Sequence, residues 1–128
     1  MKFLLDTNFL LIPGRFRVDI FRELERFGKP DVYTLDLVVR ELERISEGSG
    51  RDSRHAKLAI RLIKKKNIKI IETRTQDTDM EIARTSSEGG FVVCTQDRNL
   101  RKTLLTKGVP VVFLRQKRFL EIITPSPC

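Results

Sequence analysis

Five short apolar runs divide the chain, and polar residues, glycine or proline bound each of them. The strands that these runs predict are residues 3–5, 32–35, 68–71, 91–94 and 111–114. Short runs rich in β-branched and aliphatic residues are typical of buried strands. Because the runs are apolar at successive positions rather than alternating, they favour a parallel sheet that is covered on both faces.

Between these runs, apolar residues recur at every third or fourth position, which is the period of an amphipathic helix. The predicted helices are residues 18–27 (ending at Gly28 and Pro30), 36–47, 51–66, a short helix from about Thr78, and a helix through Leu100, Leu104 and Leu105. We expect Pro13–Gly14 to break the chain before the first helix, and Asp36 to cap the second. Strands alternating with helices predict an α/β fold with right-handed crossovers, and such folds bind ligands beyond the carboxyl ends of the strands.

A chain of 128 residues is expected to form one domain, here residues 1–123. No pattern is clear after Arg115, and residues 124–128 are expected to form a flexible tail. No apolar run approaches the roughly 18 residues that span a bilayer, and the N-terminal stretch lacks a signal-peptide cleavage site. Cys94 and Cys128 do not suggest a disulfide framework, so we expect a cytoplasmic protein without membrane association.

The chain is strongly basic, with a formal charge of +8 and a pI of about 9.9. This charge favours a polyanionic partner such as nucleic acid, although a soluble lysine-rich surface of a thermophile is the alternative. The chain has eight Phe, one Tyr and no Trp, and most of the Phe occupy periodic apolar positions. No base-stacking platform is therefore evident.

Four acids follow the predicted strands at equivalent places. Asp6 ends the first strand, Glu41 lies in the helix after the second, Asp79 opens the helix after the third, and Asp97 follows the fourth. Carboxylates crowded at one edge of a sheet repel each other unless cations neutralise them. Oxygen ligands suit Mg²⁺ or Mn²⁺ rather than zinc, so the pattern predicts a site for these ions.

Each acid also has a structural explanation. Asp97 could cap the following helix, and Asp79 could be a first-turn acid that the helix dipole favours. Asp6 has no evident helix to cap, and Glu41 lies on the apolar stripe of its helix rather than on the polar side. Asp77 competes with Asp79 for the third position, with Asp77 favoured as the helix cap. The conjunction of four acids is less probable by chance than any single one.

The chain resembles the PIN domain family in four segments that come in the family's order. They are "LLDTN" near the start, "VVRELERI" in the second predicted helix, "DTDMEIA" after the third strand and "VVCTQDRNL" after the fourth. The resemblance implies a three-layer α/β/α sandwich with a five-stranded parallel sheet in the order 3-2-1-4-5, and a ribonuclease that depends on Mg²⁺ or Mn²⁺. It carries the acidic quartet over to Asp6, Glu41, Asp79 and Asp97, with Asn8 and Thr95 as supporting residues.

Under this resemblance, the expected reaction is hydrolysis of RNA by one or two ions. Asn99 stands where some relatives carry a further acid, so a second ion is expected to bind weakly. The basic residues expected to contact RNA phosphates are Arg15, Arg17, Arg51, Arg54, Arg98, Arg101, Arg115, Lys117 and Arg118. Lone His55 is expected to be exposed and without a catalytic role.

The role in the cell stays open between two interpretations. The segment "PVVFLRQKRFLEI" resembles archaeal PIN proteins related to the endonuclease of small-subunit rRNA processing, more than a VapC toxin. The corresponding partners besides RNA would be a ribosome-assembly protein or an antitoxin, and a homodimer is a further option. A different alternative is a catalytically weak PIN module that binds RNA or assists ribosome assembly.

Two other folds that place acids at strand ends fit poorly. A receiver domain needs its phosphorylated aspartate directly after the third strand, where this chain has Glu72 and Thr73. A phosphatase of the haloacid dehalogenase type needs the pattern D-x-D after the first strand, where this chain has Asp6-Thr7-Asn8.

Overall fold

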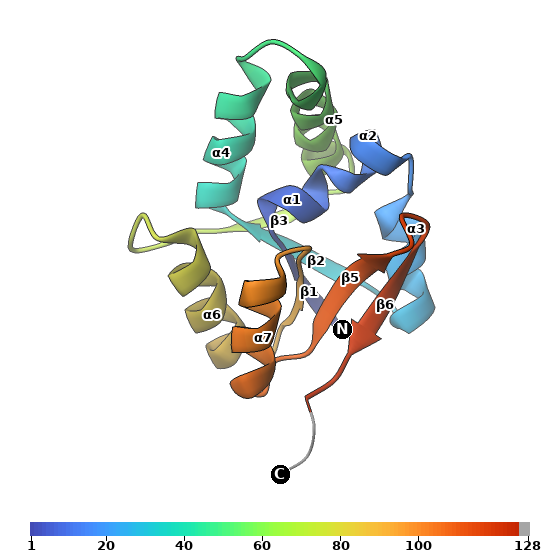
Figure 1. Ribbon diagram of the computed structural model, residues 1–128. Coiled ribbons are helices and arrows are strands. Elements are labelled where there is room, and N and C mark those ends of the chain that lie inside the picture. The colour runs from blue at the N-terminus through green and yellow to red at the C-terminus, as the bar shows by residue number, and fades with distance from the viewer. Residues whose placement is uncertain (126–128) are drawn as a thin grey trace.

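The computed structural model describes residues 1–125 and alternates strands with helices (Figure 1). The elements are β1 (Lys2–Leu5), α1 (Thr7–Leu10), α2 (Ile12–Phe16), α3 (Ile20–Leu24), the 3₁₀ turn η1 (Glu25–Phe27), β2 (Asp31–Leu35), α4 (Asp36–Ser46), α5 (Arg51–Lys65), β3 (Lys69–Ile71), α6 (Thr78–Gly89), β4 (Val92–Cys94), α7 (Arg98–Thr106), β5 (Val111–Arg115) and β6 (Phe119–Ile123). Most of the tail predicted to be flexible, residues 126–128, lies outside the described residues.

The strands form one sheet in the order β3-β2-β1-β4-β5-β6. All pairs are parallel except β5 with β6, which run antiparallel as a hairpin. The predicted α/β class and the order 3-2-1-4-5 are confirmed, but the count of five strands was wrong by one. The sixth strand was missed because the hairpin turns at Gln116 and Lys117, which adopt left-handed backbone at φ 54° and 56° without being glycine or asparagine.

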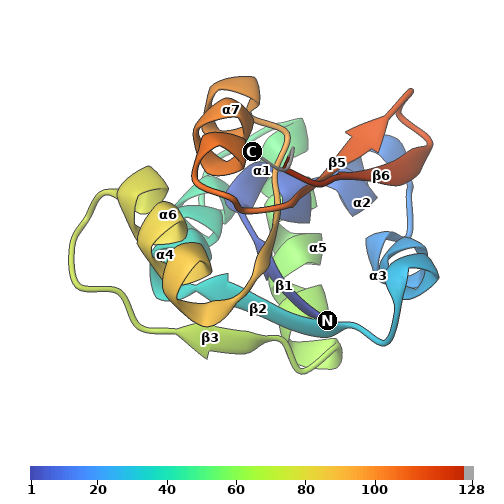
Figure 2. The ribbon, with the colours of Figure 1, turned by 90° about the horizontal axis from the view of Figure 1, so that it is seen from below.

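The direction of each crossover assigns the helices to the two faces of the sheet. From β1 the chain moves outward to β2 and β3, so right-handed connections place α1–α5 on one face. The chain then returns across the sheet to β4 and β5, which places α6 and α7 on the opposite face; these two helices lie side by side in Figure 2. The strand order reverses between β1 and β4, and ligands bind at such a switch point in open α/β sheets.

The N-terminal third of the chain differs from its prediction. Two short helices, α1 and α2, follow β1 where none was predicted. The expected break at Pro13 and Gly14 lies inside α2, because proline is tolerated in the first turn of a helix. The predicted helix 18–27 is an α-helix from Ile20 that continues as a 3₁₀ turn to Phe27.

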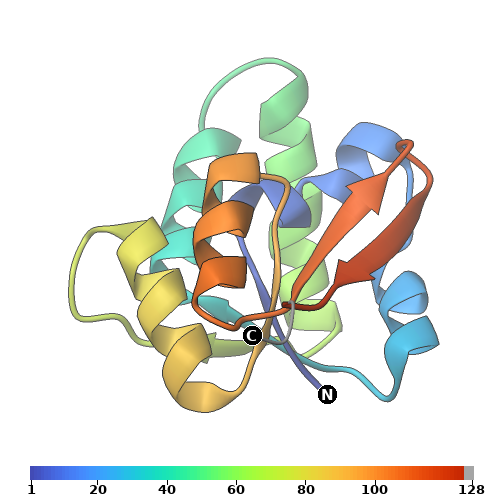
Figure 3. The same ribbon diagram turned by 60° about the horizontal axis from the view of Figure 1, so that its bottom comes forward.

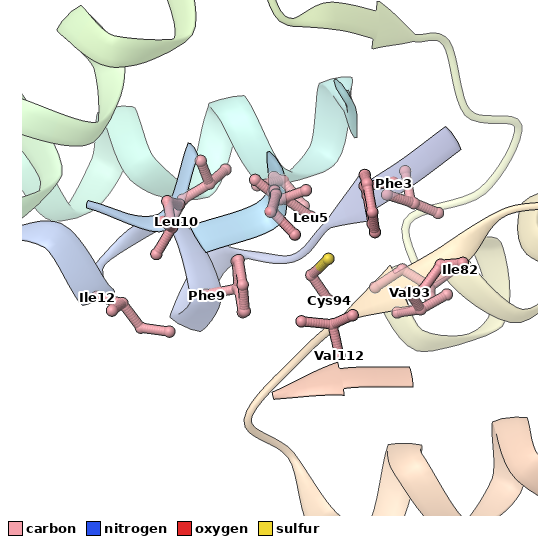
Figure 4. Packing of buried hydrophobic residues seen from close by; sticks show 14 of the residues in the cluster. Phe3, Leu5, Phe9, Leu10, Ile12, Ile82, Val93, Cys94 and Val112 are labelled. Carbon is pink, nitrogen blue, oxygen red and sulfur yellow. The ribbon is translucent and has the colours of Figure 1, made fainter. Parts of the chain in front are cut away.

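The core lies between β1, β4 and the helices that cover them. Phe3, Leu5, Val93 and Cys94 are each at most 1% exposed. Figure 4 shows them in one cluster with Ile82 from α6, Phe9 from α1 and Val112 from β5. The continuous apolar run of β1 therefore buries both of its faces, which fixes the end of this strand firmly. No helix within residues 1–125 is long and apolar enough to cross a membrane.

Candidate active site

The adjacent strands β1 and β4 bring two acids to one edge of the sheet. Leu5 pairs with Cys94 in register, and the backbone N–H of Asp6 donates to the Cys94 carbonyl at 3.2 Å. The Thr95 hydroxyl donates a hydrogen bond to Oδ2 of Asp6. The backbone N–H of Asp97 in turn donates to the Thr95 hydroxyl oxygen at 3.1 Å. Thr95 therefore links the two acids and holds Asp6 in place.

Asp6 also caps a helix. It is the N-cap of α1, and its Oδ1 accepts a hydrogen bond from the Phe9 N–H at 2.9 Å. The residue is 7% exposed, so this carboxylate is buried against donors that are all neutral. The sequence-based statement that no helix needs a cap at Asp6 was wrong, because α1 is a single turn too short to show a helical period.

Asp97 caps a helix, as one of its two interpretations predicted, and its role as a metal ligand stays a prediction. It is the N-cap of α7, and its Oδ1 accepts hydrogen bonds from the N–H groups of Asn99 at 2.9 Å and Leu100 at 3.1 Å. No donor within residues 1–125 reaches its second oxygen, Oδ2. Asp97 is exposed, so this oxygen is available to a ligand from solvent.

One pocket of about 190 Å³ gathers the four predicted acids. It is lined by Asp6, Thr7, Asn8, Glu41, Thr78, Asp79, Ile82 and Asp97. Figure 1 shows the corresponding arrangement of the backbone, in which the N-terminal ends of α4, α6 and α7 turn toward α1. Glu41 is half-buried on α4 and Asp79 is exposed in the first turn of α6. Four separate elements thus contribute one carboxylate each to a single small pocket.

The start of α6 separates Asp77 from Asp79. Asp77 is the N-cap, and its Oδ1 accepts a hydrogen bond from the Met80 N–H at 3.1 Å. Asp77 does not line the acidic pocket, whereas Asp79 does. Ile82 lines the pocket beside Asp79 and is 1% exposed, so this face of α6 is turned toward the sheet. The register expected for this helix agrees with the structure.

The carboxylates influence each other electrostatically. Burial raises the pKa of Asp6 to about 6, against the hydrogen bonds from Thr95 and Phe9, and the charges of Asp97 and Asp79 raise it further. The pKa of Asp79 is also raised, first by partial burial and then by the charges of Asp97, Asp77 and Glu41. The pocket therefore concentrates negative charge that no basic residue in its lining compensates.

The donor set of the pocket fits a hard divalent cation. The lining offers carboxylate, hydroxyl and amide oxygens, which suit Mg²⁺ or Mn²⁺. Thr7 supplies a buried hydroxyl that has no hydrogen-bond partner within the described residues. Within residues 1–125, no three Asp, Glu, His or Cys side chains already converge in a group that could hold a metal ion. An ion would therefore be held by Asp6 as the fixed ligand, with rotation of the more exposed Glu41, Asp79 and Asp97.

Asn8 is tied to a neighbouring helix through an arginine. Arg15 donates to the Asn8 side-chain oxygen at 3.4 Å and forms two hydrogen bonds with the Asp52 carboxylate, at 3.1 and 3.0 Å. This links the pocket to the first turn of α5. His55 lies 3.5 Å from Asp52 and packs on Gly14, so it is half-buried rather than exposed as predicted.

Asp36 differs from its predicted role as a helix cap. The N-cap of α4 is Leu35, and Asp36 is the first residue of the helix. Its Oδ1 accepts hydrogen bonds from the N–H and hydroxyl of Thr73, at 3.2 and 2.6 Å, and its Oδ2 pairs with Arg40 at 3.0 Å. The tertiary contact with Thr73 replaces the cap, and it joins α4 to the segment that leads from β3 to α6.

Seven of the nine predicted RNA-contacting residues lie in two groups. Arg51 and Arg54 open α5 next to Asp52 and are exposed. The second group occupies α7 and the turn between β5 and β6 and consists of Arg98, Arg101, Arg115, Lys117 and Arg118. Of the remaining two, Arg15 is paired with Asp52, and Arg17 is exposed at the end of α2. Figure 3 shows that the turn of the hairpin reaches α2, in agreement with the Lys117 amine lying 5.9 Å from the Phe16 ring.

Sequence reasoning missed several polar residues around the site. Thr7 and Thr78 line the pocket, and Gln96 lies between Thr95 and Asp97 with its side chain bonded to the Leu114 N–H at 2.6 Å. Thr7 and Gln96 stand directly beside predicted acids, and this adjacency is the signal that could have found them. Nothing in the periodicity distinguishes them from loop residues.

Comparison with known proteins identifies a family over most of the chain. Residues 3–117 match the PIN like domain family. Ribonuclease VapC4 of Methanocaldococcus jannaschii is 30% identical over 126 residues, covering 94% of this chain and 95% of that protein. Ribonuclease VapC9 of Archaeoglobus fulgidus is 25% identical over 121 residues, covering 92% and 87%.

Solved structures agree on the fold. The PIN domain endonuclease Utp24 superposes with a TM-score of 0.79 at 21% identity, over 99% of this chain and 96% of that chain. PAE2754 from Pyrobaculum aerophilum superposes with a TM-score of 0.51 at 20% identity, over 84% and 79%. At these identities the likeness supports the architecture alone.

Proposed function

The chain belongs to the PIN-like domain family, and we propose that it is a divalent-metal-dependent endoribonuclease that hydrolyses phosphodiester bonds of RNA. The observation that carries the proposal is the pocket in which Asp6, Glu41, Asp79 and Asp97 meet at the switch point of the sheet. Two relatives that cover nearly the whole chain are named ribonucleases, which supports a nuclease. The net charge of +8 supports a polyanionic substrate.

Asp6 and Asp97, with help from Glu41, would hold one Mg²⁺ or Mn²⁺ ion. Asp6 is held at both oxygens, so it fixes the position of the ion relative to β1 and β4. When bound, a divalent cation neutralises negative charge on a phosphate oxygen and lowers the pKa of the water molecule that it binds. Asp79 would orient the attacking water or contribute to a second ion site.

The residues of the candidate site would then have roles that their positions support. Thr95 and the Phe9 N–H keep Asp6 in one orientation, so binding a cation costs little side-chain entropy. The exposed Asp79 carboxylate faces the pocket without a hydrogen-bond donor of its own in residues 1–125, which leaves it able to accept a proton from water. Arg98 directly follows Asp97, and Arg51 precedes Asp52, which Arg15 links to Asn8 of the pocket, so arginines of α7 and α5 would hold RNA phosphates near the cleaved bond.

Of the two roles in the cell, toxin-type cleavage gains support from the two relatives that carry the name VapC. In that case the protein partner would be an antitoxin. The likeness to Utp24 supports the fold and does not by itself favour rRNA processing.

The proposal is tested by incubating the purified protein with a panel of single-stranded RNAs in Mn²⁺, in Mg²⁺ and in EDTA. We expect cleavage with either ion and none in EDTA. The matched control is Glu43→Gln, since Glu43 is an exposed acid on α4 two residues from Glu41 that does not line the pocket. Cleavage should be lost in Glu41→Gln and retained in Glu43→Gln. A wild-type protein that binds RNA but cleaves none of the panel would instead support a catalytically weak RNA-binding module.

A further inference from the structure

A second pocket, of about 380 Å³, lies next to the acidic one and shares no lining residue with it. It is lined by Gln96, Arg98, Arg101, Phe113, Leu114, Arg115 and Gln116, and we call it the arginine pocket. Gln96 and Arg98 are the two sequence neighbours of Asp97, which lines the acidic pocket. The arginine pocket is thus joined to the candidate catalytic site through the first turn of α7.

The polar side chains of the arginine pocket are three arginines and two glutamines. No carboxylate lines it, and Arg98 and Arg101 form no ion pair within residues 1–125. The third arginine, Arg115, pairs with Glu121 at 2.6 Å, and both side chains remain well exposed. Guanidinium groups have no acceptor, so a ligand of this pocket must supply the acceptors itself.

Gln96 adds a further donor in a fixed orientation. Its side-chain oxygen accepts a hydrogen bond from the Leu114 N–H at 2.6 Å. Because that bond occupies the oxygen, the two N–H groups of the amide face away from Leu114, and neither donates to another group among residues 1–125. The helix end adds little here, since the Asn99 and Leu100 N–H groups are already occupied by Asp97.

Arg101 is held by an aromatic ring. Its guanidinium group lies 4.8 Å from the centre of the Phe113 ring, and the residue is half-buried. Stacking of this kind orients the planar guanidinium group and reduces the entropy that it loses when it binds an anion. The pocket is therefore organised before binding, unlike the mobile side chains of an ordinary basic surface.

We propose that the arginine pocket binds the phosphate of one nucleotide that flanks the cleaved bond of a single-stranded RNA. This inference rests on the proposed function and adds a defined position to it. Three arginines and a fixed amide match the acceptors of a phosphodiester, which arginine binds in a bidentate manner. The volume suits one nucleotide, since it is near the lower end of the roughly 300–1,000 Å³ range of ligand pockets. RNA that ends before this pocket should bind more weakly than RNA that reaches it.

The first test measures binding of a uridine pentanucleotide in EDTA, where no cleavage interferes, at several salt concentrations. The double variant Arg98→Gln/Arg101→Gln should bind about tenfold more weakly, and its slope of log affinity against log salt should be smaller by about 0.7, the value for one phosphate of a single strand. The control Arg61→Gln/Lys64→Gln removes the same charge from exposed positions of α5 that do not line the pocket. It should weaken binding by about twofold at most. Equal losses in the two double variants would overturn the proposal.

The second test follows the Gln96 side-chain amide by ¹H–¹⁵N NMR during the same titration. We expect its signals to shift in the wild type and to stay in place in the double variant, whose well-dispersed backbone spectrum would show that it is folded. Unmoved Gln96 signals on a wild type that binds the oligonucleotide would overturn the proposal. Binding that depends on the pocket, in a protein that cleaves no RNA with Mn²⁺, would refute the nuclease and leave the arginine pocket as an RNA subsite.

Discussion

Two buried carboxylates of this chain lie in opposite electrostatic surroundings. Glu81 on α6 is 1% exposed, and Asp6 at the end of β1 is 7% exposed. The Glu81 carboxylate accepts hydrogen bonds from the Arg84 guanidinium at 2.6 Å, from the Thr75 hydroxyl at 2.9 Å and from the Arg74 N–H at 3.2 Å. The Asp6 carboxylate accepts only from neutral donors and lies near other acids.

The pKa values of the two groups move in opposite directions. Arg84, the largest influence, together with the hydrogen bonds from Thr75 and Arg74, lowers the pKa of Glu81 to about 2. Burial raises the pKa of Asp6 to about 6. The fold therefore places the Arg84 guanidinium beside Glu81 but only neutral donors beside Asp6, whose charge a proton or a bound metal ion would have to neutralise. A structural acid and a candidate metal ligand differ in this way, even though they are buried to a similar extent.

Glu81 also supports the candidate site indirectly. Its hydrogen bonds to Arg74 and Thr75 hold the segment before α6, whose first turn carries Asp79. These two hydrogen bonds are thus expected to fix the start of the helix that presents Asp79 to the acidic pocket.

The largest expected effect is on catalysis and concerns the pocket acids, which have no positively charged side chain as a partner among residues 1–125. Asp6→Asn and Asp79→Asn should each reduce the rate of RNA cleavage in Mn²⁺ on the order of 10³-fold or more, because each removes a group that acts at the metal. Initial rates on a fluorescent RNA at saturating Mn²⁺ measure this. Activity near the wild-type level in Asp6→Asn would show that cleavage does not need Asp6 as a metal ligand.

The next effect is on stability and concerns Glu81. Glu81→Gln should lower the melting temperature on the order of 10 °C, because it leaves the Arg84 charge without its closest partner. Glu88→Gln is the matched control, since Glu88 also pairs with Arg84, at 3.3 Å, but its side chain is 66% exposed. Calorimetry of both variants should show little change for Glu88→Gln. Equal melting temperatures in the two variants would mean that burial does not distinguish these two pairs.

The pH dependence of stability should have opposite signs for the two buried acids. In metal-free protein, Asp6→Asn should be more stable than the wild type at pH 7 by at most about 3 kcal/mol, since each pKa unit corresponds to about 1.36 kcal/mol. The folded pKa of Asp6, about 6, lies above its ordinary value of 3.8, so this acid costs the wild type stability as the pH rises from about 4 to about 6.

For Glu81 the folded pKa of about 2 lies below the ordinary 4.5, so its stabilisation is present above about pH 4.5 and is lost as the pH falls toward 2. Urea unfolding in EDTA across this pH range measures the contributions of Asp6 and Glu81 to the free energy of unfolding. Adding Mn²⁺ should stabilise the wild type at neutral pH but not Asp6→Asn. An Asp6→Asn profile that runs parallel to that of the wild type would contradict the raised pKa.

The smallest expected effect concerns Asp77, the N-cap of α6, which lies two residues before Asp79. Asp77→Asn should cost about 1 kcal/mol of stability or less, because asparagine also caps helices, and cleavage should be retained. The same two assays, run beside Asp79→Asn, test this. A loss of cleavage in Asp77→Asn with normal activity in Asp79→Asn would exchange the roles of the two acids.

The fold could be predicted where the sequence carries a strong local signal. The runs at 3–5, 91–94 and 111–114 became β1, β4 and β5, because a strand buried on both faces must be apolar at successive positions. The helices α1 and α2 were missed, since one or two turns show no period. β6 was missed because its turn uses left-handed backbone at Gln116 and Lys117, for which these residue types give no signal.

The sequence by itself placed Asp6, Glu41, Asp79 and Asp97 beyond the ends of strands, and a parallel sheet then has to bring such residues to one edge. The sequence did not reveal which buried acid lies beside a positively charged side chain. Glu81 was not recognised, and the bonds that satisfy it come partly from Arg74 and Thr75, in a segment without secondary structure. The arginine pocket likewise joins α7 to β5, residues that only the packed sheet brings together. Position along a strand follows from local periodicity, whereas compensation of charge depends on which groups the tertiary structure places within a few ångströms.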